Sequence, residues 1–144
     1  MSKNKIDTRY LEQLLGYNAR RAALVIIERF IQEMAPFDLR PVDFSVMSVI
    51  LHNPGVTSRQ LCATLSILPP NLVGLIKTLE QRGLIERQPH PSDGRALGLH
   101  ATAKGQSLMK EAEQVALQLE QQSAHRLSAQ EQTQLIELLQ KIYR

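Results

Sequence analysis

Polar and basic side chains with the potential to bind an anionic polymer gather between residues 66 and 105. A predicted helix carries Asn71 and Lys77, and Arg95 follows a loop of turn-forming residues. An asparagine amide can hydrogen-bond a base edge at two points, and an arginine at a loop tip can enter a narrow, negatively charged groove. Residues 56–105 carry a formal charge of +3, whereas the residues before them carry +1 and those after them −1. The charge distribution favours a nucleic-acid partner at this segment.

The helix that carries these groups is predicted from Pro69 to about Arg82. Proline suits the first turn of a helix, and Gly83 can adopt the positive φ that often ends one. The apolar residues at helical spacing form its buried stripe: Leu72, Leu75, Ile76 and Leu79. A shorter helix precedes it and begins with a capping box in which Thr57 caps and Gln60 reaches back. Two short helices joined by a brief turn predict a helix-turn-helix.

A hairpin is predicted directly after this pair of helices. Residues 84–88 alternate as a strand, residues 89–94 are typical of a loop, and residues 96–101 form the returning strand. Two strands alone are only marginally stable, so we expect the hairpin to pack on the helices.

The remaining segments are predicted to be helical. Asp7 or Thr8 can cap a first helix that runs to about Met34, and its apolar residues cover more than one face, as expected at a subunit interface. A second helix begins at Pro41. A long helix extends from residue 102 to about residue 122, and Ser128 with its partner Glu131 opens the last one. The last helix has an apolar stripe: Leu135, Leu138, Leu139 and Ile142.

Length and composition limit the class of protein. The 144 residues, 43% hydrophobic and 22% charged, are typical of one globular domain. No apolar run is long enough for a membrane span, and the charged first ten residues lack the features of a signal peptide, so we expect a cytoplasmic protein without a membrane partner. The single cysteine, Cys62, cannot form an internal disulfide.

The order of elements and three motifs resemble the MarR family of bacterial winged-helix transcription regulators. The motifs are LEQRGLIER at 79–87, DGR at 93–95 and TAKG at 102–105. The resemblance implies a mainly α fold in one domain, residues 1–144. In that fold a winged helix-turn-helix with a small β-hairpin wing spans about 39–101, and dimerisation helices span about 7–35 and 103–144.

The same resemblance implies a function. Such proteins bind a pseudo-palindromic operator in double-stranded DNA as homodimers, with recognition helices roughly 34 Å apart. It further implies a repressor, not an enzyme, that releases DNA when a small organic ligand, often an aromatic acid, binds. No metal or other cofactor is expected.

The predicted DNA contacts come from the two helices and the hairpin loop. They are Thr57, Ser58, Arg59, Pro70, Asn71, Val73, Gly74, Lys77, Arg82, His90, Ser92, Asp93, Gly94 and Arg95. Lys77 suits a phosphate, and Thr57 has capping as its certain role. Pro70 and Val73 could touch a thymine methyl or simply pack at the helix start. In the family pattern Asp93 restrains the wing through a basic residue, for which Arg82 is the candidate.

Two further features of the recognition helix bear on specificity. Glycine in the interior of a helix costs about 1 kcal/mol compared with alanine. The presence of Gly74 therefore suggests that DNA or a neighbouring helix approaches the backbone closely at this position. Relatives tend to carry serine, threonine and arginine where this chain has Pro69-Pro70-Asn71 and Val73-Gly74. We therefore expect much of the specificity to come from DNA shape and half-site spacing.

An effector site is predicted between the first two helices. Its candidate lining residues are Tyr17, Arg21, Phe44, Met47 and Leu51. Arg21, or its neighbour Arg20, could pair with a carboxylate. Alternatively, the apolar members are ordinary core residues and the arginines form a solvated face.

Two other classes of function remain as alternatives. One is a helical protein-interaction module that does not bind DNA, and the other is a small hydrolase or redox protein that uses Cys62. The position of Cys62 on the inward face of a short helix favours a structural thiol. The four histidines lack ligand spacing, and His90, Ser92 and Asp93 share one loop, which cannot give triad geometry.

Overall fold

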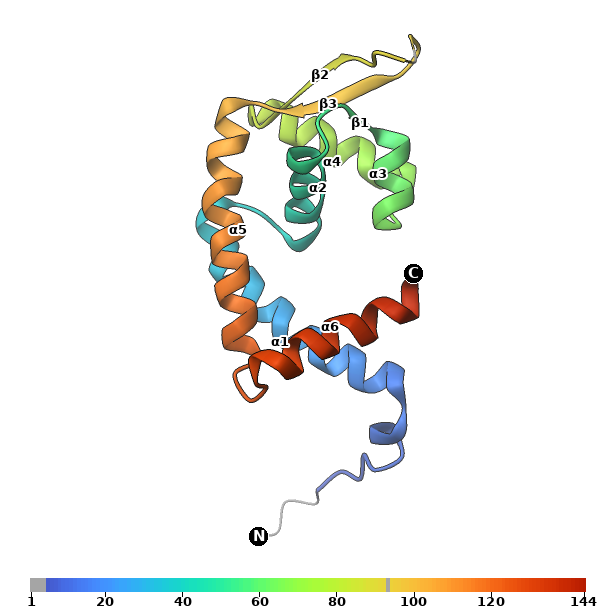
Figure 1. Cartoon of the computed structure of the whole chain (residues 1–144), viewed down its shortest axis with the longest axis vertical. Helices are drawn as coiled ribbons and strands as arrows, with labels where there is room; N and C mark the ends of the chain where they lie inside the picture. The colour runs from blue at the N-terminus through green and yellow to red at the C-terminus, as the bar shows by residue number, and fades with distance from the viewer. Residues whose placement is uncertain (1–4, 93) are drawn as a thin grey trace.

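The computed structural model describes residues 5–92 and 94–144, which form six α-helices, two short 3₁₀ helices and a three-stranded sheet. Its elements are η1 (Leu11–Gln13), α1 (Leu15–Met34), η2 (Ala35–Phe37), α2 (Pro41–His52), β1 (Val56–Thr57), α3 (Ser58–Leu65), α4 (Pro69–Gln81), β2 (Ile85–Pro89), β3 (Leu97–Ala101), α5 (Ala103–Ser123) and α6 (Ala129–Tyr143). Figure 1 shows an elongated molecule, with α2, α3, α4 and the sheet at one end, α1 and α6 toward the other, and α5 running between. The mainly helical prediction is confirmed.

The start of α1 differs from the prediction. Neither Asp7 nor Thr8 caps it, because the Asp7 carboxylate accepts hydrogen bonds from Arg9 and the Thr8 hydroxyl donates to Glu12. Those residues lead into η1, and α1 begins after Leu14, whose extended backbone breaks the helical path. Local side-chain pairs thus replace the predicted cap.

The start of α2 agrees with the prediction and adds an interaction. Pro41 occupies the first helical position, and the Asp43 carboxylate accepts hydrogen bonds from the backbone N–H, Nε and Nη2 of Arg40, each at 2.9 Å. Burial by itself would raise the pKa of Asp43, but the hydrogen bonds from Arg40 and the charges of Arg40 and Arg82 lower it below the ordinary value. The aspartate is therefore held ionised at the helix N-terminus, where a negative charge is favourable.

The sheet has one more strand than predicted. The strand order is β1-β3-β2, all antiparallel, with Val56 opposite Leu99 and Ile85 opposite Ala101. The predicted hairpin is the β2–β3 pair. The two-residue β1 attaches it to the helices, because Gly55, at φ +90°, turns the end of α2 toward β3 and donates a hydrogen bond to Leu99.

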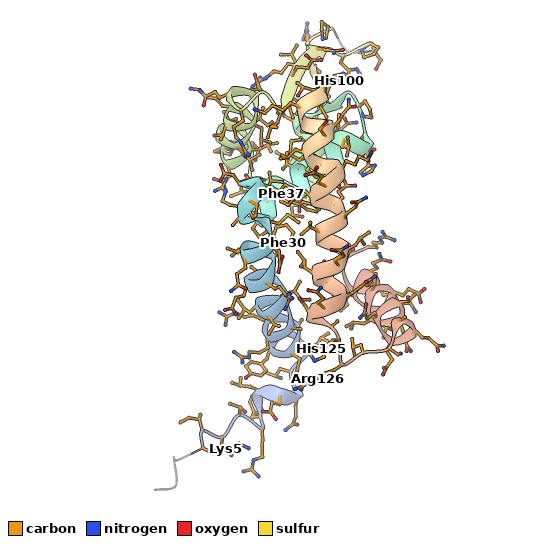
Figure 2. The ribbon with its side chains drawn as sticks, turned by 90° about the vertical axis from the view of Figure 1, so that its left-hand side faces the viewer. Lys5, Phe30, Phe37, His100, His125 and Arg126 are labelled. Atoms are coloured by element: carbon orange, nitrogen blue, oxygen red, sulfur yellow. The ribbon has the colours of Figure 1, made fainter. Side chains whose placement is uncertain are left out.

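One apolar core joins the winged helix to α1 and α5. Its buried residues come from helices α1 to α5, from strands β2 and β3 and from two connecting segments. They are Met34, Leu39, Val46, Met47, Ile50, Leu61, Leu72, Leu75, Ile76, Leu79, Leu84, Ile85, Leu99, Met109, Ala112 and Leu119. The predicted stripe of α4 is entirely within it. At the edge of this core, Phe30 of α1 meets Phe44 of α2 edge-on at 5.2 Å between ring centroids. Figure 2 shows Phe30 and Phe37 beside α5, between the winged helix and the far end of α1.

The helices away from the winged helix leave apolar side chains exposed. None of the α6 residues, 129–143, is buried in its own chain, although the capping box of Ser128 and Glu131 forms as predicted. The exposed apolar residues of α1 and α6 include Leu15, Leu24, Val25, Ile27, Ile31, Leu135, Ile136, Leu138, Leu139 and Ile142. In the described part of the chain, no single helix is long and apolar enough to cross a membrane, and only the sharply bent pair α3–α4 reaches that limit when taken together.

Replacing Asp43 with asparagine should destabilise the fold by about 1–2 kcal/mol near pH 7, because the ionised acceptor at the start of α2 is lost. A carboxyl whose pKa is lowered by folding stabilises the protein above its unfolded pKa, and that stabilisation is lost as the pH falls through the lower folded value. The difference between wild type and Asp43→Asn in urea unfolding should therefore shrink below about pH 3.8.

Asp7→Asn provides the matched control, because Asp7 also pairs with a nearby arginine but does so in solvent. It should leave the free energy of unfolding unchanged. Equal effects of the two substitutions would contradict the role assigned to Asp43.

Candidate nucleic-acid interface

The turn between α3 and α4 sets the direction of α4, the predicted recognition helix. Ser66 ends α3 in the left-handed conformation, at φ +53°, and the N–H of Ile67 donates to the Cys62 carbonyl at 3.1 Å. The axis then bends by 118° into α4, where Pro69 and Pro70 occupy the first positions. Proline lacks an N–H and has a helical φ, so it starts this helix without a side-chain cap.

One face of α4 is core and the other is open. Asn71, Val73, Gly74 and Lys77 are exposed, as is Pro70, while the leucine and isoleucine stripe is buried. Val73 is 66% exposed, which excludes packing within this chain as the reason for an apolar residue there. Among the described residues, nothing lies within 4 Å of a Cβ placed on Gly74, so no neighbouring helix requires glycine.

The start of α3 lies close to the sheet. Thr57 closes the predicted capping box: its hydroxyl accepts from the N–H of Gln60 at 3.2 Å, and its own N–H donates to Oε1 of that residue at 2.9 Å. Ser58 and Arg59 follow in the first turn and are exposed. An exposed arginine and the amides of a first helical turn are groups of the kind that bind a phosphate.

The wing loop projects beyond the helices (Figure 1). The N–H of His90 donates to the Ala96 carbonyl at 3.1 Å, and the backbone N–H and hydroxyl of Ser92 lie 3.2 and 3.1 Å from Nδ1 of His90. Gly94 and Arg95 are exposed next to this turn. Asp93 lies outside the described residues, and so does its predicted contact with Arg82.

The described partners of Arg82 are backbone carbonyls far along the chain. Its side chain is half-buried at the end of α4 and donates from Nη1 to the Asp38 carbonyl at 2.7 Å and from Nη2 to the Phe37 carbonyl at 3.0 Å. Nothing in the sequence pattern pointed to these partners, because they are backbone carbonyls more than forty residues away, at the end of η2.

Arg87 is an additional basic group beside the site that the sequence analysis did not include. It lies on β2 and pairs with Glu80 of α4, which links the wing to the recognition helix. Strand alternation could have located it, since Arg87 shares the face of Ile85, which is buried against the helices.

The predicted effector residues are divided between core and surface. Met47 is 0% exposed and Leu51 packs against the core, while Phe44 is held by Phe30. Tyr17 is half-buried on α1, and both Arg21 and Arg20 are exposed. The core role considered for the α2 residues is therefore confirmed for Met47.

Two side chains considered for other functions pack or pair within the fold. Cys62 is half-buried against the core. His52 of α2 pairs with Glu113 of α5 at 2.9 Å. Within the ranges 5–92 and 94–144, no three histidine, cysteine, aspartate or glutamate side chains are placed to hold a metal ion.

Comparisons with known proteins match this arrangement. Residues 37–96 match the model of the MarR family. The chain is 30% identical over 131 residues to a protein named as a transcriptional regulatory protein for the hcr operon of Thauera aromatica, covering 90% of this chain and 79% of that one.

Two solved structures are similar over most of the chain. The transcriptional repressor CouR bound to a 23-mer DNA duplex is 34% identical, with a TM-score of 0.90 over 98% of this chain and 100% of that one. CouR from Rhodococcus jostii RHA1 bound to p-coumaroyl-CoA is 27% identical, with a TM-score of 0.83 over 92% and 93%. The chain therefore belongs to the MarR family of winged-helix transcriptional regulators.

Proposed function

We propose that this protein is a dimeric transcriptional repressor that binds a pseudo-palindromic operator in double-stranded DNA. The observation that carries the proposal is the open face of α4, which presents Asn71, Gly74 and Lys77 while the opposite face is core. Exposed Arg59 and Arg95 supply positive charge from α3 and the wing. The DNA-bound CouR structure supports the same use of the fold.

The dimer in this proposal is formed by α1, α5 and α6. Their exposed leucine, isoleucine and valine side chains would otherwise form a large apolar surface in water, which monomeric proteins rarely tolerate. A symmetric pair would bury these faces and give two recognition helices related by a two-fold axis.

Each element has a distinct role on the duplex in this proposal. α4 enters the major groove, where Asn71 pairs with an adenine edge and Val73 touches a thymine methyl. Lys77, Arg59 and the first turn of α3 contact phosphates. The wing places Arg95 in the minor groove, with His90, Ser92 and Gly94 forming the loop that carries it. Because α4 offers few donors, groove shape contributes much of the selectivity.

Arg95→Ala should weaken binding to a duplex selected by the wild-type protein from a random pool at least tenfold, which corresponds to about 1.4 kcal/mol. The arginine would no longer neutralise the minor groove. Arg95→Lys is the matched control and should lose less, because it keeps the positive charge. An unchanged affinity of Arg95→Ala in a fluorescence titration would rule out the wing contact.

Gly74→Ala should stabilise the fold but weaken DNA binding. Nothing in the described chain opposes the new methyl group, so the helix should gain roughly 0.5–1 kcal/mol in thermal or urea unfolding. The affinity for the selected duplex should fall about tenfold or more, because the methyl group holds α4 away from the groove floor. A stabilised variant with wild-type affinity would show that Gly74 does not approach DNA closely.

We further propose that an aromatic carboxylic acid, free or as its coenzyme A thioester, releases the protein from DNA. The CouR structure with p-coumaroyl-CoA supports this class of ligand. Tyr17 and Arg21 on α1, with Phe44 and Leu51 on α2, would line the site, and Arg21 would pair with the anionic group. Met47 would support this wall from the core.

The effector proposal can be tested with salicylate, p-coumarate and p-coumaroyl-CoA added to the protein–duplex complex. At least one should lower the apparent DNA affinity about tenfold, a coupling typical of two linked sites. Arg21→Gln should abolish most of this response while retaining DNA affinity. If none of the three compounds changes DNA binding, the proposed ligand class is wrong.

A further inference from the structure

The end of the recognition helix is the point where three distant segments meet. α4 closes with hydrogen bonds from the N–H of Arg82 to Thr78 and from the N–H of Leu84 to Leu79, both at 3.0 Å. Gly83 then adopts φ +72° and turns the chain into β2. These residues therefore connect the recognition helix directly to the first strand of the wing.

The Arg82 side chain ties this junction to the segment between α1 and α2. Its two terminal nitrogens donate to the adjacent carbonyls of Phe37 and Asp38, at 3.0 and 2.7 Å. Asp38 is in the left-handed conformation, at φ +50°, where the chain bends from η2 toward α2. A planar guanidinium matches two neighbouring acceptors at once, which a lysine ammonium at the end of a flexible stem does not.

α5 holds the same junction from the other side. Nζ of Lys104 donates to the Arg82 carbonyl at 2.9 Å, and the Thr102 hydroxyl donates to the Gly83 carbonyl at 2.6 Å. The N–H of Thr102 donates to the Leu84 carbonyl at 3.0 Å. The C-terminal end of α4 is thus bonded to the end of η2 through the Arg82 side chain and to the beginning of α5 through its backbone carbonyls.

We propose that Arg82 is a positioning residue that fixes the angle between the recognition helix and the dimerisation helices, and so sets the operator half-site spacing that the dimer accepts. The inference rests on the proposed function, in which α1, α5 and α6 form the dimer. Arg82 contributes through the carbonyls of Phe37 and Asp38, in place of a contact with DNA. Losing the clamp would let α4 pivot on its buried stripe and engage half-sites at more than one separation.

Operators of altered spacing test this inference. The probe is the duplex that the wild-type protein selects from a random pool, compared with versions in which one base pair is added to or removed from its centre. Each change displaces one half-site by roughly 3.4 Å and rotates it by about 35°. The wild type should prefer the selected spacing by about tenfold or more, whereas Arg82→Gln should bind all three duplexes within about threefold of one another.

The salt dependence of binding separates positioning from phosphate contact. Lys77→Ala should keep the spacing preference and reduce the slope of log K against log salt by about 1.8, because each subunit loses one phosphate contact. Arg82→Gln should leave that slope unchanged. A reduced slope with an intact spacing preference in Arg82→Gln would overturn the inference and make Arg82 a DNA contact.

Two further variants guard against a general loss of stability. Ile76→Val, chosen as a mild core destabilisation in the same helix, should retain the wild-type spacing preference. Arg82→Lys keeps the positive charge but cannot donate to both carbonyls in the same way, so its preference for one half-site spacing should be as weak as that of Arg82→Gln. A wild-type spacing preference in Arg82→Lys would refute the proposed role of Arg82. Failure of the wild type to select a two-fold symmetric duplex would instead reject the proposed function itself.

Discussion

The close packing of α5 against the turn after the recognition helix is the constraint on which the rest of the structure depends. A Cβ on Gly105 would lie 2.1 Å from the carbonyl oxygen of Leu84, so only glycine allows this approach. The same carbonyl accepts the hydrogen bond from Thr102 that begins α5. Because a backbone cannot move aside as a flexible side chain can, this contact fixes how closely the start of α5 approaches the end of α4.

This close packing also helps to hold the small β-hairpin in a fixed position on the helices. The strands are held at one end by α5, through Thr102, and at the side by β1, which pairs with β3. Arg87 adds a link to α4 through Glu80. The wing loop extends from a base that is bonded on three sides, so the position of its tip follows the position of the recognition helix.

Most of the fold could be predicted because its signals are local. Capping boxes at Thr57 and Ser128 and the prolines at 41 and 69 mark helix starts, and the period of the apolar residues in α4 identifies all four buried positions. The strand β1 was missed because two residues carry no alternation. The start of α1 was predicted too early because the side chains of Asp7 and Thr8 hydrogen-bond to the neighbouring side chains of Arg9 and Glu12 and do not cap the helix.

The exposed residues of the site could be predicted where the helical spacing of the apolar residues shows which face of a helix is buried. Asn71, Gly74 and Lys77 were assigned to the open face of α4 from the sequence, and they are exposed. The partners of Arg82 could not be predicted, since they are main-chain carbonyls and any residue type presents them. The resemblance to a family directed attention to the wing, whereas the described contacts of this arginine lie at the end of η2, on the far side of α4 in the sequence.

The C-terminal helix has a consequence for how much active protein a cell holds. α6 buries none of its residues in its own chain, and an isolated helix of its length is only marginally stable in water. Its folding is therefore coupled to association in the proposed dimer, so it depends on subunit concentration. At low expression, a larger share of chains would carry a frayed, apolar tail that proteases recognise, which would sharpen the dependence of regulator abundance on synthesis rate.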